Sequence, residues 1–519
     1  MGEVISTNTA RRRVTQIGAK TNQPPADSSD AQRALGAKAR TGAIWIVAGF
    51  GAGQVLRLAV NIALAALLFQ EAFALMAIVS AVMQGLAMFS DIGLSPSVVR
   101  SRRGGEPDYL NTAWTLQVIR GAALCLVAIL LAWPIAAMYS VNDPMAQELR
   151  WLIPLVALTA LVDGFHSSRM LTAAREMQLK RTTLIEMVVQ VSNAVVMLGL
   201  AWSLRSVYAL AFAALLSSTL RTALTYWMLP GLPSRFMLEP AAVRSIVSFG
   251  KWIFVSTVLS FLAMQIDRLV LAGFFPLAEV GVYAIAVGLS MLVTALVGML
   301  QSAVVFPWYS RMLDEGVELS EAFRKTRAPI LLMSTFVACL MVVGAESLFE
   351  LAYDERYRLA AVYLPILAIG GWFSCLESMY GAAFLATGHS RWVAWVSLVK
   401  VLSFGLMLIP LMIFDWGLVT ATVMVLASEM LRTTSSQYLG RQLGLRNLRI
   451  ETAMLLLLLV SSGAGMWLAK GFAPVADLHP ALRLLVLGLI MSAIFAPAFS
   501  RILWPLIKWR KSGGSTPSI

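Results

Sequence analysis

The chain has 519 residues, of which 58% are hydrophobic and only 13% are charged, and its formal net charge is +13. Soluble globular proteins carry about 25% charged residues, so the composition and the mean hydropathy of +0.75 exclude that class. Long apolar stretches follow one another with short charged loops between them. Because about 20 apolar residues span the hydrocarbon core of a membrane, the sequence predicts an all-α polytopic membrane protein.

Residues 1–40 are polar and rich in Ser, Thr, Pro and basic residues, which predicts a disordered cytoplasmic tail. About fourteen membrane-spanning helices are expected after this tail. Their predicted ranges are 42–69, 72–97, 112–139, 149–174, 182–203, 207–229, 246–274, 278–309, 329–352, 361–386, 392–414, 416–439, 451–472 and 481–507. The last two carry ionisable residues only at their edges, so residues 451–507 are interpreted as a lipid-facing pair beside a twelve-helix body. A second cytoplasmic tail, 508–519, ends the chain.

Basic residues gather in alternate loops. The basic segments are Arg100–Arg103, Arg175–Arg181, Arg311–Arg327, Arg441–Arg449 and Lys508–Lys511. The loops between them, such as 140–148 and 471–480, are short and free of lysine. This asymmetry follows the positive-inside rule, and it predicts that both termini lie in the cytoplasm. Because the topology explains much of the net charge, no nucleic-acid partner is expected.

Two similar stretches suggest an internal duplication. Trp45 and Trp252 open the first and seventh spans, and each is followed by a glutamine and an arginine three residues apart: Gln54 and Arg57, then Gln265 and Arg268. Six spans separate the copies, and an even number returns the chain to the same side. The halves would then be parallel repeats related by an axis along the membrane normal. Coincidence is the alternative, since Trp and Arg recur at the ends of spans.

The first span carries a polar face. Gln54, Arg57 and Asn61 are three and four residues apart, so they share one side of a helix. A charge at the bilayer centre costs several kcal/mol, at least about 2.5 on the smaller scales, and this face is therefore expected to point into the bundle or a cavity. Arg57 has no acidic residue one turn away, which favours a role in substrate binding. Other ionisable residues within the spans of this half are Arg120, Asp163, His166 and Glu186.

The second half has its own charged residues within the predicted spans: Asp267, Arg268, Glu377, Lys400, Glu429 and Arg432. Glu429 and Arg432 are three apart and can form an internal salt bridge that only locks helices. A buried carboxylate can titrate within the working pH range. The candidates for ion coupling are Asp163, Glu186, Asp267 and Glu377.

Neither a metal nor a cofactor is expected. Cys125, Cys339 and Cys375 all lie in apolar segments without the paired spacing of a zinc site or a disulfide framework. The chain also lacks a glycine-rich phosphate loop and a nucleophile elbow. A polysaccharide polymerase or ligase is the enzyme alternative, and it is disfavoured because no sizeable outer loop is predicted to hold an acceptor.

Four stretches carry a family resemblance: Phe89–Ser95, Leu110–Trp114, Gln265–Leu271 and Val280–Ala286. Their order and spacing resemble the Wzx-like polysaccharide transporter family of oligosaccharide flippases, in the multidrug/oligosaccharidyl-lipid/polysaccharide (MOP) exporter superfamily. The likeness runs from about residue 41 to residue 440. It implies two six-helix lobes around a central cavity, the N-lobe at 41–230 and the C-lobe at 246–440, with the pair 451–507 outside them.

The resemblance also implies a function. Family members move undecaprenyl-diphosphate-linked oligosaccharides across the bacterial inner membrane by alternating access, for exopolysaccharide, capsule or O-antigen synthesis. Coupling to an ion gradient is expected, and a polysaccharide polymerase and the export machinery are candidate partners beside membrane lipids. A multidrug antiporter of the same superfamily is the alternative function.

A diphosphate is best recognised by arginine, whose guanidinium forms bidentate hydrogen bonds with phosphate. Arg57 and Arg268 stand at matching places in the two repeats and would face one another across the cavity. We therefore expect Arg57, Arg268 and Arg120 to bind the diphosphate, with Gln54 and Asn61 beside them.

Overall fold

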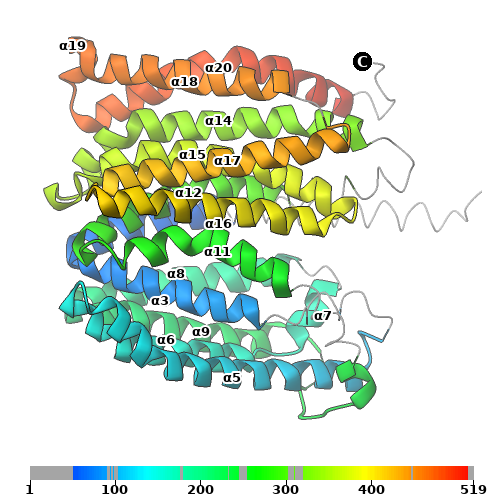
Figure 1. The fold of residues 1–519 in the computed structure, drawn as a ribbon. Coiled ribbons are helices and arrows are strands. Elements are labelled where there is room, and N and C mark those ends of the chain that lie inside the picture. Colours follow the sequence, from blue (N-terminus) through cyan, green and yellow to red (C-terminus); the bar gives the residue numbers. More distant parts are fainter. Residues whose placement is uncertain are drawn as a thin grey trace, which may run out of the picture.

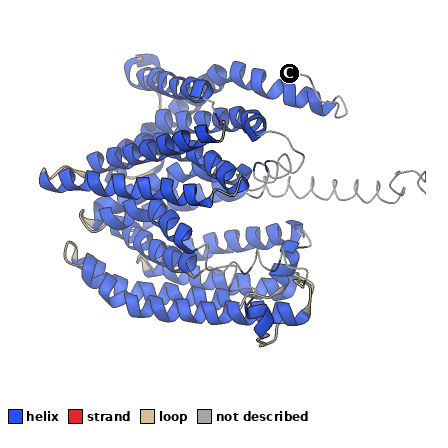
Figure 2. Ribbon diagram, turned by 45° about the vertical axis from the view of Figure 1, so that its right-hand side comes forward, coloured by secondary structure: helices blue, strands red, loops and turns tan. Residues whose placement is uncertain are grey.

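The structure, a computed structural model, describes residues 51–90, 103–175, 179–231, 233–244, 254–301, 319–445 and 448–511, together with positions 49, 94, 98, 305 and 309. Within these residues every regular element is a helix and no strand is formed (Figure 2). The expected tail at 1–40 and the tryptophans at 45 and 252 lie outside the described residues.

The first half of the chain forms a helix at Gly51–Leu67, then α3 (Gln70–Phe89), α5 (Pro107–Tyr139), α6 (Leu149–Gly164), α7 (Arg169–Arg175), α8 (Leu179–Leu204) and α9 (Tyr208–Met228). The second half forms α11 (Phe254–Leu271), α12 (Leu277–Leu300), α14 (Leu319–Ala352), α15 (Ala360–Ala386), α16 (Ser390–Ile413) and α17 (Leu418–Gln442). The chain then forms α18 (Leu448–Gly471), the short α19 (Ala473–Ala476) and α20 (Pro480–Lys511).

Ten of the described helices are long and apolar enough to cross a membrane. Most observed bounds agree with the predicted spans to within a few residues, because proline, glycine and charged loops separate the apolar runs. The protein is thus a multi-span, all-helical membrane protein as predicted. The expected count of fourteen crossings is compatible with this arrangement.

One predicted span, 149–174, is broken in the structure. Helix α6 ends at Gly164, and α7 begins only at Arg169. Serine side chains compete for backbone hydrogen bonds and favour helix ends, and Ser167 and Ser168 lie in this interval. The end of α9 holds the break open, since Thr225 accepts the Ser167 amide at 3.2 Å and Arg169 donates to the Tyr226 carbonyl at 2.7 Å.

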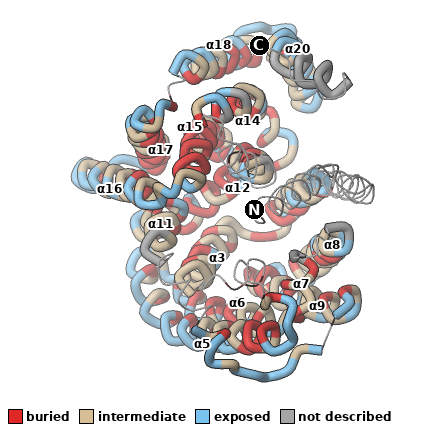
Figure 3. Tube along the Cα trace, turned by 90° about the vertical axis from the view of Figure 1, so that its right-hand side faces the viewer, coloured by how far each residue is buried: buried red, intermediate tan, exposed pale blue. Residues whose placement is uncertain are grey.

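The helices lie nearly parallel and form two bundles side by side (Figure 1). The N-lobe contains helix 51–67 and α3 to α9, and the C-lobe contains α11 to α17. Helices α18 and α20 pack against α14, on the side of the C-lobe that faces away from the N-lobe (Figures 1 and 3). The pair therefore lies at the periphery of a body with two lobes.

Small residues let neighbouring helices approach closely, as is common within membranes. A Cβ at Gly121 of α5 would lie 2.5 Å from the Ala160 carbonyl oxygen of α6. A Cβ at Gly281 of α12 would collide with the Gln70 carbonyl at the start of α3. The second contact joins the two lobes, so α3 and α12 form part of the seam between them.

Large apolar side chains cover the outside of the bundles. Trp133, Trp227, Ile413 and Trp467 are all more than half exposed. In water such a surface would be unfavourable, whereas lipid chains cover it without cost. The buried residues gather towards the interior of each lobe (Figure 3).

Candidate functional site

The C-lobe contains a buried network of four charged side chains on α15, α16 and α17. Lys400 Nζ lies 2.5 Å from Glu429 Oε1, and Arg432 lies 2.7 Å from Glu377 Oε2 and 3.5 Å from Glu429 Oε2. None of the four side chains is more than 13% exposed. Two cations and two anions cancel, which is the condition under which charges remain buried. We call these four residues the buried quartet.

The N-lobe holds its charges in a more open setting. Arg221 of α9 lies 2.6 Å from Glu186 of α8, and the two side chains are 37% and 36% exposed. Asp163 of α6 accepts a hydrogen bond of 2.5 Å from Ser218, and its side chain is 47% exposed. The N-lobe carboxylates are therefore paired but remain accessible.

The sequence predicted that His166 lies within a span. In the structure it lies beyond the end of α6. Its Nε2 is 3.5 Å from Asp163 Oδ1. Burial lowers the pKa of His166 below its ordinary value, while Asp163 opposes that shift and Arg221 adds to it. Burial therefore disfavours the charged imidazolium at a position beside the Asp163 carboxylate.

Helix 51–67 touches both lobes. On one side a Cβ at Gly53 would lie 2.5 Å from Gln190 Oε1 of α8, so the helix packs tightly along α8. On the other side Asn61 accepts a hydrogen bond of 3.5 Å from the Tyr353 hydroxyl, just after α14. Gln54 is partly buried and Arg57 is exposed. The predicted polar face therefore borders the seam, and within the described residues no hydrogen bond or ion pair engages the Arg57 guanidinium.

Helix α11 brings a second polar group to the seam. Arg268 donates to Gln265 Oε1 at 3.2 Å, and Gln265 in turn donates to Gln84 of α3. Asp267 accepts a hydrogen bond of 2.7 Å from the Tyr283 hydroxyl of α12. The second carboxylate oxygen of Asp267 is buried without a hydrogen-bond partner among the described residues. The Arg268 guanidinium is therefore oriented by residues that join the two lobes.

Arg120 is engaged differently from the other two arginines. Its guanidinium donates to the Ala87 carbonyl at 2.6 Å and to Ser90 Oγ at 2.9 Å. These contacts fasten the end of α3 to α5. Within the part of the chain that the structure describes, no hydrogen bond joins Arg57 to Arg268, and their facing one another across a cavity stays a prediction.

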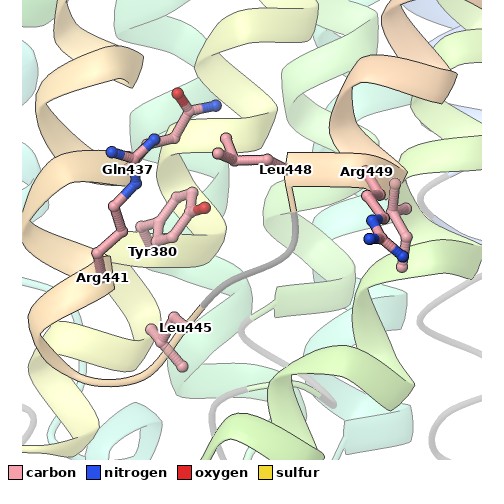
Figure 4. Close-up of a pocket in the computed structure, with 7 residues that line it drawn as sticks. Tyr380, Gln437, Arg441, Leu445, Leu448 and Arg449 are labelled. Carbon is pink, nitrogen blue, oxygen red and sulfur yellow. The ribbon is translucent and has the colours of Figure 1, made fainter.

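The lobes are hydrogen-bonded to each other at the end that carries the lysine-poor loops. There Tyr139 donates to the Leu269 carbonyl at 2.8 Å, and Asn142 donates to the Gly273 carbonyl. The Leu277 amide donates to Asp143 at 3.2 Å. The opposite end, where α17 ends and α18 begins, is the basic end. Two cavities of about 700 and 200 Å³ lie at the basic end, the larger of them shown in Figure 4.

The described residues contain no group of three or more His, Cys, Asp and Glu side chains that could hold a metal ion. A site made of arginines, amides and paired carboxylates can bind an anion or exchange a proton.

Comparison with known proteins places these features in a family. Residues 63–362 match the family described as "Polysaccharide biosynthesis protein". The chain belongs to this family. It is similar to "Lipopolysaccharide biosynthesis protein WzxC" of Escherichia coli (strain K12), with 22% identity over 68% of this chain and 69% of that protein. It is also similar to "Teichuronic acid biosynthesis protein TuaB" of Bacillus subtilis (strain 168), with 19% identity over 58% of this chain and 61% of that one.

Solved structures show the same fold. The structure of "Lipid II flippase MurJ, inward closed conformation" matches with a TM-score of 0.65 and 12% identity, covering 89% of this chain and 99% of that chain. An inward-facing multidrug resistance transporter, from the MATE family of the MOP superfamily, matches with a TM-score of 0.59 and 16% identity, covering 78% and 95%. The predicted resemblance and fold class are thereby confirmed.

Sequence reasoning missed two charged residues of this family member. Arg221 lies in the middle of the predicted span 207–229, so its position alone could have revealed it. Arg327 was placed in a basic loop, whereas the structure buries it completely within α14, between the rings of Phe323 and Tyr380. Only the apolar residues that follow it in the chain hinted at this.

Proposed function

We propose that the protein is a flippase that moves undecaprenyl-diphosphate-linked oligosaccharides across the bacterial inner membrane by alternating access. It would act in exopolysaccharide, capsule or O-antigen synthesis as a transporter and not as an enzyme. The main support is the polar seam between two lobes in a chain of the polysaccharide biosynthesis family. The named functions of the matched proteins, in lipopolysaccharide and teichuronic acid biosynthesis, agree with this class of cargo.

Arg57 and Arg268 are our candidates for the diphosphate. Arg57 is exposed and has no hydrogen bond or ion pair among the described residues, which leaves its guanidinium available to a ligand, and Arg268 is held in place by Gln265. Gln54 and Asn61 share the helix face of Arg57 and can donate further hydrogen bonds. Arg120 could contribute only after exchanging its contacts with Ala87 and Ser90.

The four candidate carboxylates for ion coupling differ in access. The side chains of Asp163 and Glu186 are 47% and 36% exposed, so the packing of the N-lobe leaves them accessible without rearrangement. Among the described residues, one buried carboxylate oxygen of Asp267, beside the seam, has no hydrogen-bond partner. Glu377 is held by Arg432 inside the buried quartet. We favour Asp163 and Glu186, because a coupling site must exchange its ion with solvent.

Alternating access would require the interlobe hydrogen bonds to break. Tyr139–Leu269, Asn142–Gly273 and Asp143–Leu277 all lie at the lysine-poor end. We assign that end to the periplasm and the basic end, with both termini, to the cytoplasm. The structure would then represent a state closed towards the periplasm. The functional units would be 41–230 and 246–440, with 451–507 as an accessory pair.

Reconstitution of the full chain in liposomes tests the proposed function. An undecaprenyl-diphosphate-linked oligosaccharide on one leaflet should become accessible on the other, and the same oligosaccharide without its lipid should stay in place. Failure to move the lipid-linked sugar, with proton-driven uptake of cationic drugs in the same liposomes, would identify a multidrug antiporter instead. A polysaccharide polymerase and the export machinery remain proposed partners.

A further inference from the structure

The larger cavity lies away from the seam, at the basic end between α17 and α18. It has a volume of about 700 Å³ and is lined by Tyr380, Gln437, Arg441, Leu445, Leu448, Arg449 and Ile450. Figure 4 shows Gln437 and Arg441 side by side on α17 next to Tyr380, with Arg449 at the start of α18. A cavity of this size is within the range of small-molecule sites.

A buried ion pair forms the wall behind this cavity. Glu451 of α18 receives hydrogen bonds from Tyr380, at 2.7 Å, and from Gln437, and it pairs with Arg327. The Arg327 guanidinium stacks between two rings, with its Cζ 4.5 Å from the centre of Phe323 and 4.4 Å from that of Tyr380. The charge of the Glu451 carboxylate is therefore already balanced by Arg327, and its oxygens are occupied by Tyr380 and Gln437. It does not neutralise the arginines that line the cavity.

The turn that opens the cavity has a defined conformation. Helix α17 ends in a turn with Gly444 at φ +76°, where the Leu445 amide donates to the Gly440 carbonyl at 3.0 Å. This pattern satisfies the last carbonyls of the helix. Gly440 has no side chain, which lets Tyr380 approach closely. The chain then enters α18, whose first residues, Leu448 to Ile450, line the cavity.

The chemistry of the lining favours an anion. Arg441 and Arg449 are both exposed, and no Asp or Glu is among the described residues that line the cavity. The amides of the first turn of a helix lack partners within that helix and attract negative charge. Leu445, Leu448 and Ile450 add an apolar wall beside the arginines. Two arginines, a helix start and an apolar wall suit a phosphate that is joined to acyl chains.

We infer that this cavity between α17 and α18 binds the phosphate headgroup of an anionic phospholipid from the membrane leaflet at the basic end. The anionic lipids of the cytoplasmic leaflet attract such basic sites. A bound lipid would hold the pair α18–α20 against the C-lobe. The site lies outside the proposed substrate path, so its test can fail while the proposed function stands.

The test uses the purified full chain in neutral detergent and measures retained lipid by native mass spectrometry. Phosphatidylglycerol and phosphatidylcholine are compared, with inorganic phosphate and a polyprenyl diphosphate as competitors. We expect one tightly retained phosphatidylglycerol, no retained phosphatidylcholine, and a loss of affinity of at least about tenfold in the R441Q/R449Q double variant. The exposed Arg501 of α20 lies outside the cavity, and R501Q is the matched control that should bind as the unaltered chain does.

Three results would overturn the inference. Equal retention of phosphatidylglycerol by the double variant and the unaltered chain would show that Arg441 and Arg449 do not bind the lipid. Equal retention of phosphatidylcholine would show that the cavity does not select negative charge. Displacement of the phospholipid by inorganic phosphate or by polyprenyl diphosphate at lower concentration would assign the phosphate site to that competitor and not to a membrane phospholipid.

Discussion

The two lobes differ in how far the charged side chains on their helices are buried. In the C-lobe, Lys400, Glu429, Arg432 and Glu377 cancel one another out of contact with solvent. In the N-lobe, Glu186 pairs with Arg221 at a half-open position and Asp163 is nearly half exposed. Charges of the first kind hold helices together, and charges of the second kind remain able to exchange ions. Whether an ionisable residue at membrane depth is a functional candidate therefore depends on its partners and on how exposed it is.

The largest effect is expected from breaking the buried quartet. Glu429→Ala removes the partner of Lys400 and half of the pairing of Arg432, and an uncompensated buried charge costs about 3–5 kcal/mol. The folded yield and the thermal unfolding temperature in detergent should fall sharply. The control is the double variant Lys400→Met with Glu429→Leu, which should recover much of the loss. Normal yield and unfolding temperature for Glu429→Ala alone would show that the quartet does not stabilise the C-lobe.

A smaller effect on stability is expected in the N-lobe. Glu186→Ala breaks a partly exposed pair, and such pairs contribute about 0–1 kcal/mol. The folded yield should stay close to that of the unaltered chain, whereas ion-driven transport should fall if Glu186 exchanges the coupling ion. Transport measured with and without a proton gradient separates the two roles. A large loss of folded protein would place Glu186 in the same structural class as Glu429.

The smallest effect is expected from His166. Burial of its imidazole lowers its pKa below the ordinary value of 6.5. Below about pH 6.5 the unfolded chain binds a proton at His166 more readily than the folded chain does. The free energy of unfolding therefore decreases as the pH drops below about 6.5. Between pH 7.5 and 5.5, His166→Gln should reduce the fall in unfolding temperature by a small but measurable amount, about 2 °C. An unchanged pH dependence of the unfolding temperature in this variant would show that His166 does not contribute to it.

Much of the helical framework follows from the sequence, because a span needs a continuous apolar run and its ends are marked by proline, glycine and charge. The break after Gly164 was not predicted, because it depends on hydrogen bonds to the end of α9. The Ser167 amide donates to Thr225, and Arg169 donates to the Tyr226 carbonyl. Spacing correctly predicted the contact of Glu429 with Arg432, three residues apart on one helix.

Partners that come from different helices could not be predicted in the same way. Lys400 and Glu429 lie on α16 and α17, and no helical period connects them. The pairing of Arg327 with Glu451 joins α14 to α18 across more than a hundred residues. Such pairs depend on which helices pack together, and one sequence contains no direct signal for that. The same limit applies to Arg57 and Arg268, whose joint role stays a prediction.

The most direct test of the central claim measures flipping of an undecaprenyl-diphosphate-linked oligosaccharide by the Arg57→Ala, Arg268→Ala double variant in liposomes. Arg358→Ala serves as the control, because Arg358 is highly exposed and lies at the lysine-poor end. At equal amounts of folded protein, we predict a loss of at least about tenfold in the double variant, as for removal of a charge-assisted contact to phosphate. The control should flip at the normal rate. A double variant that flips the lipid-linked oligosaccharide normally would contradict the proposal that an anionic cargo passes these arginines.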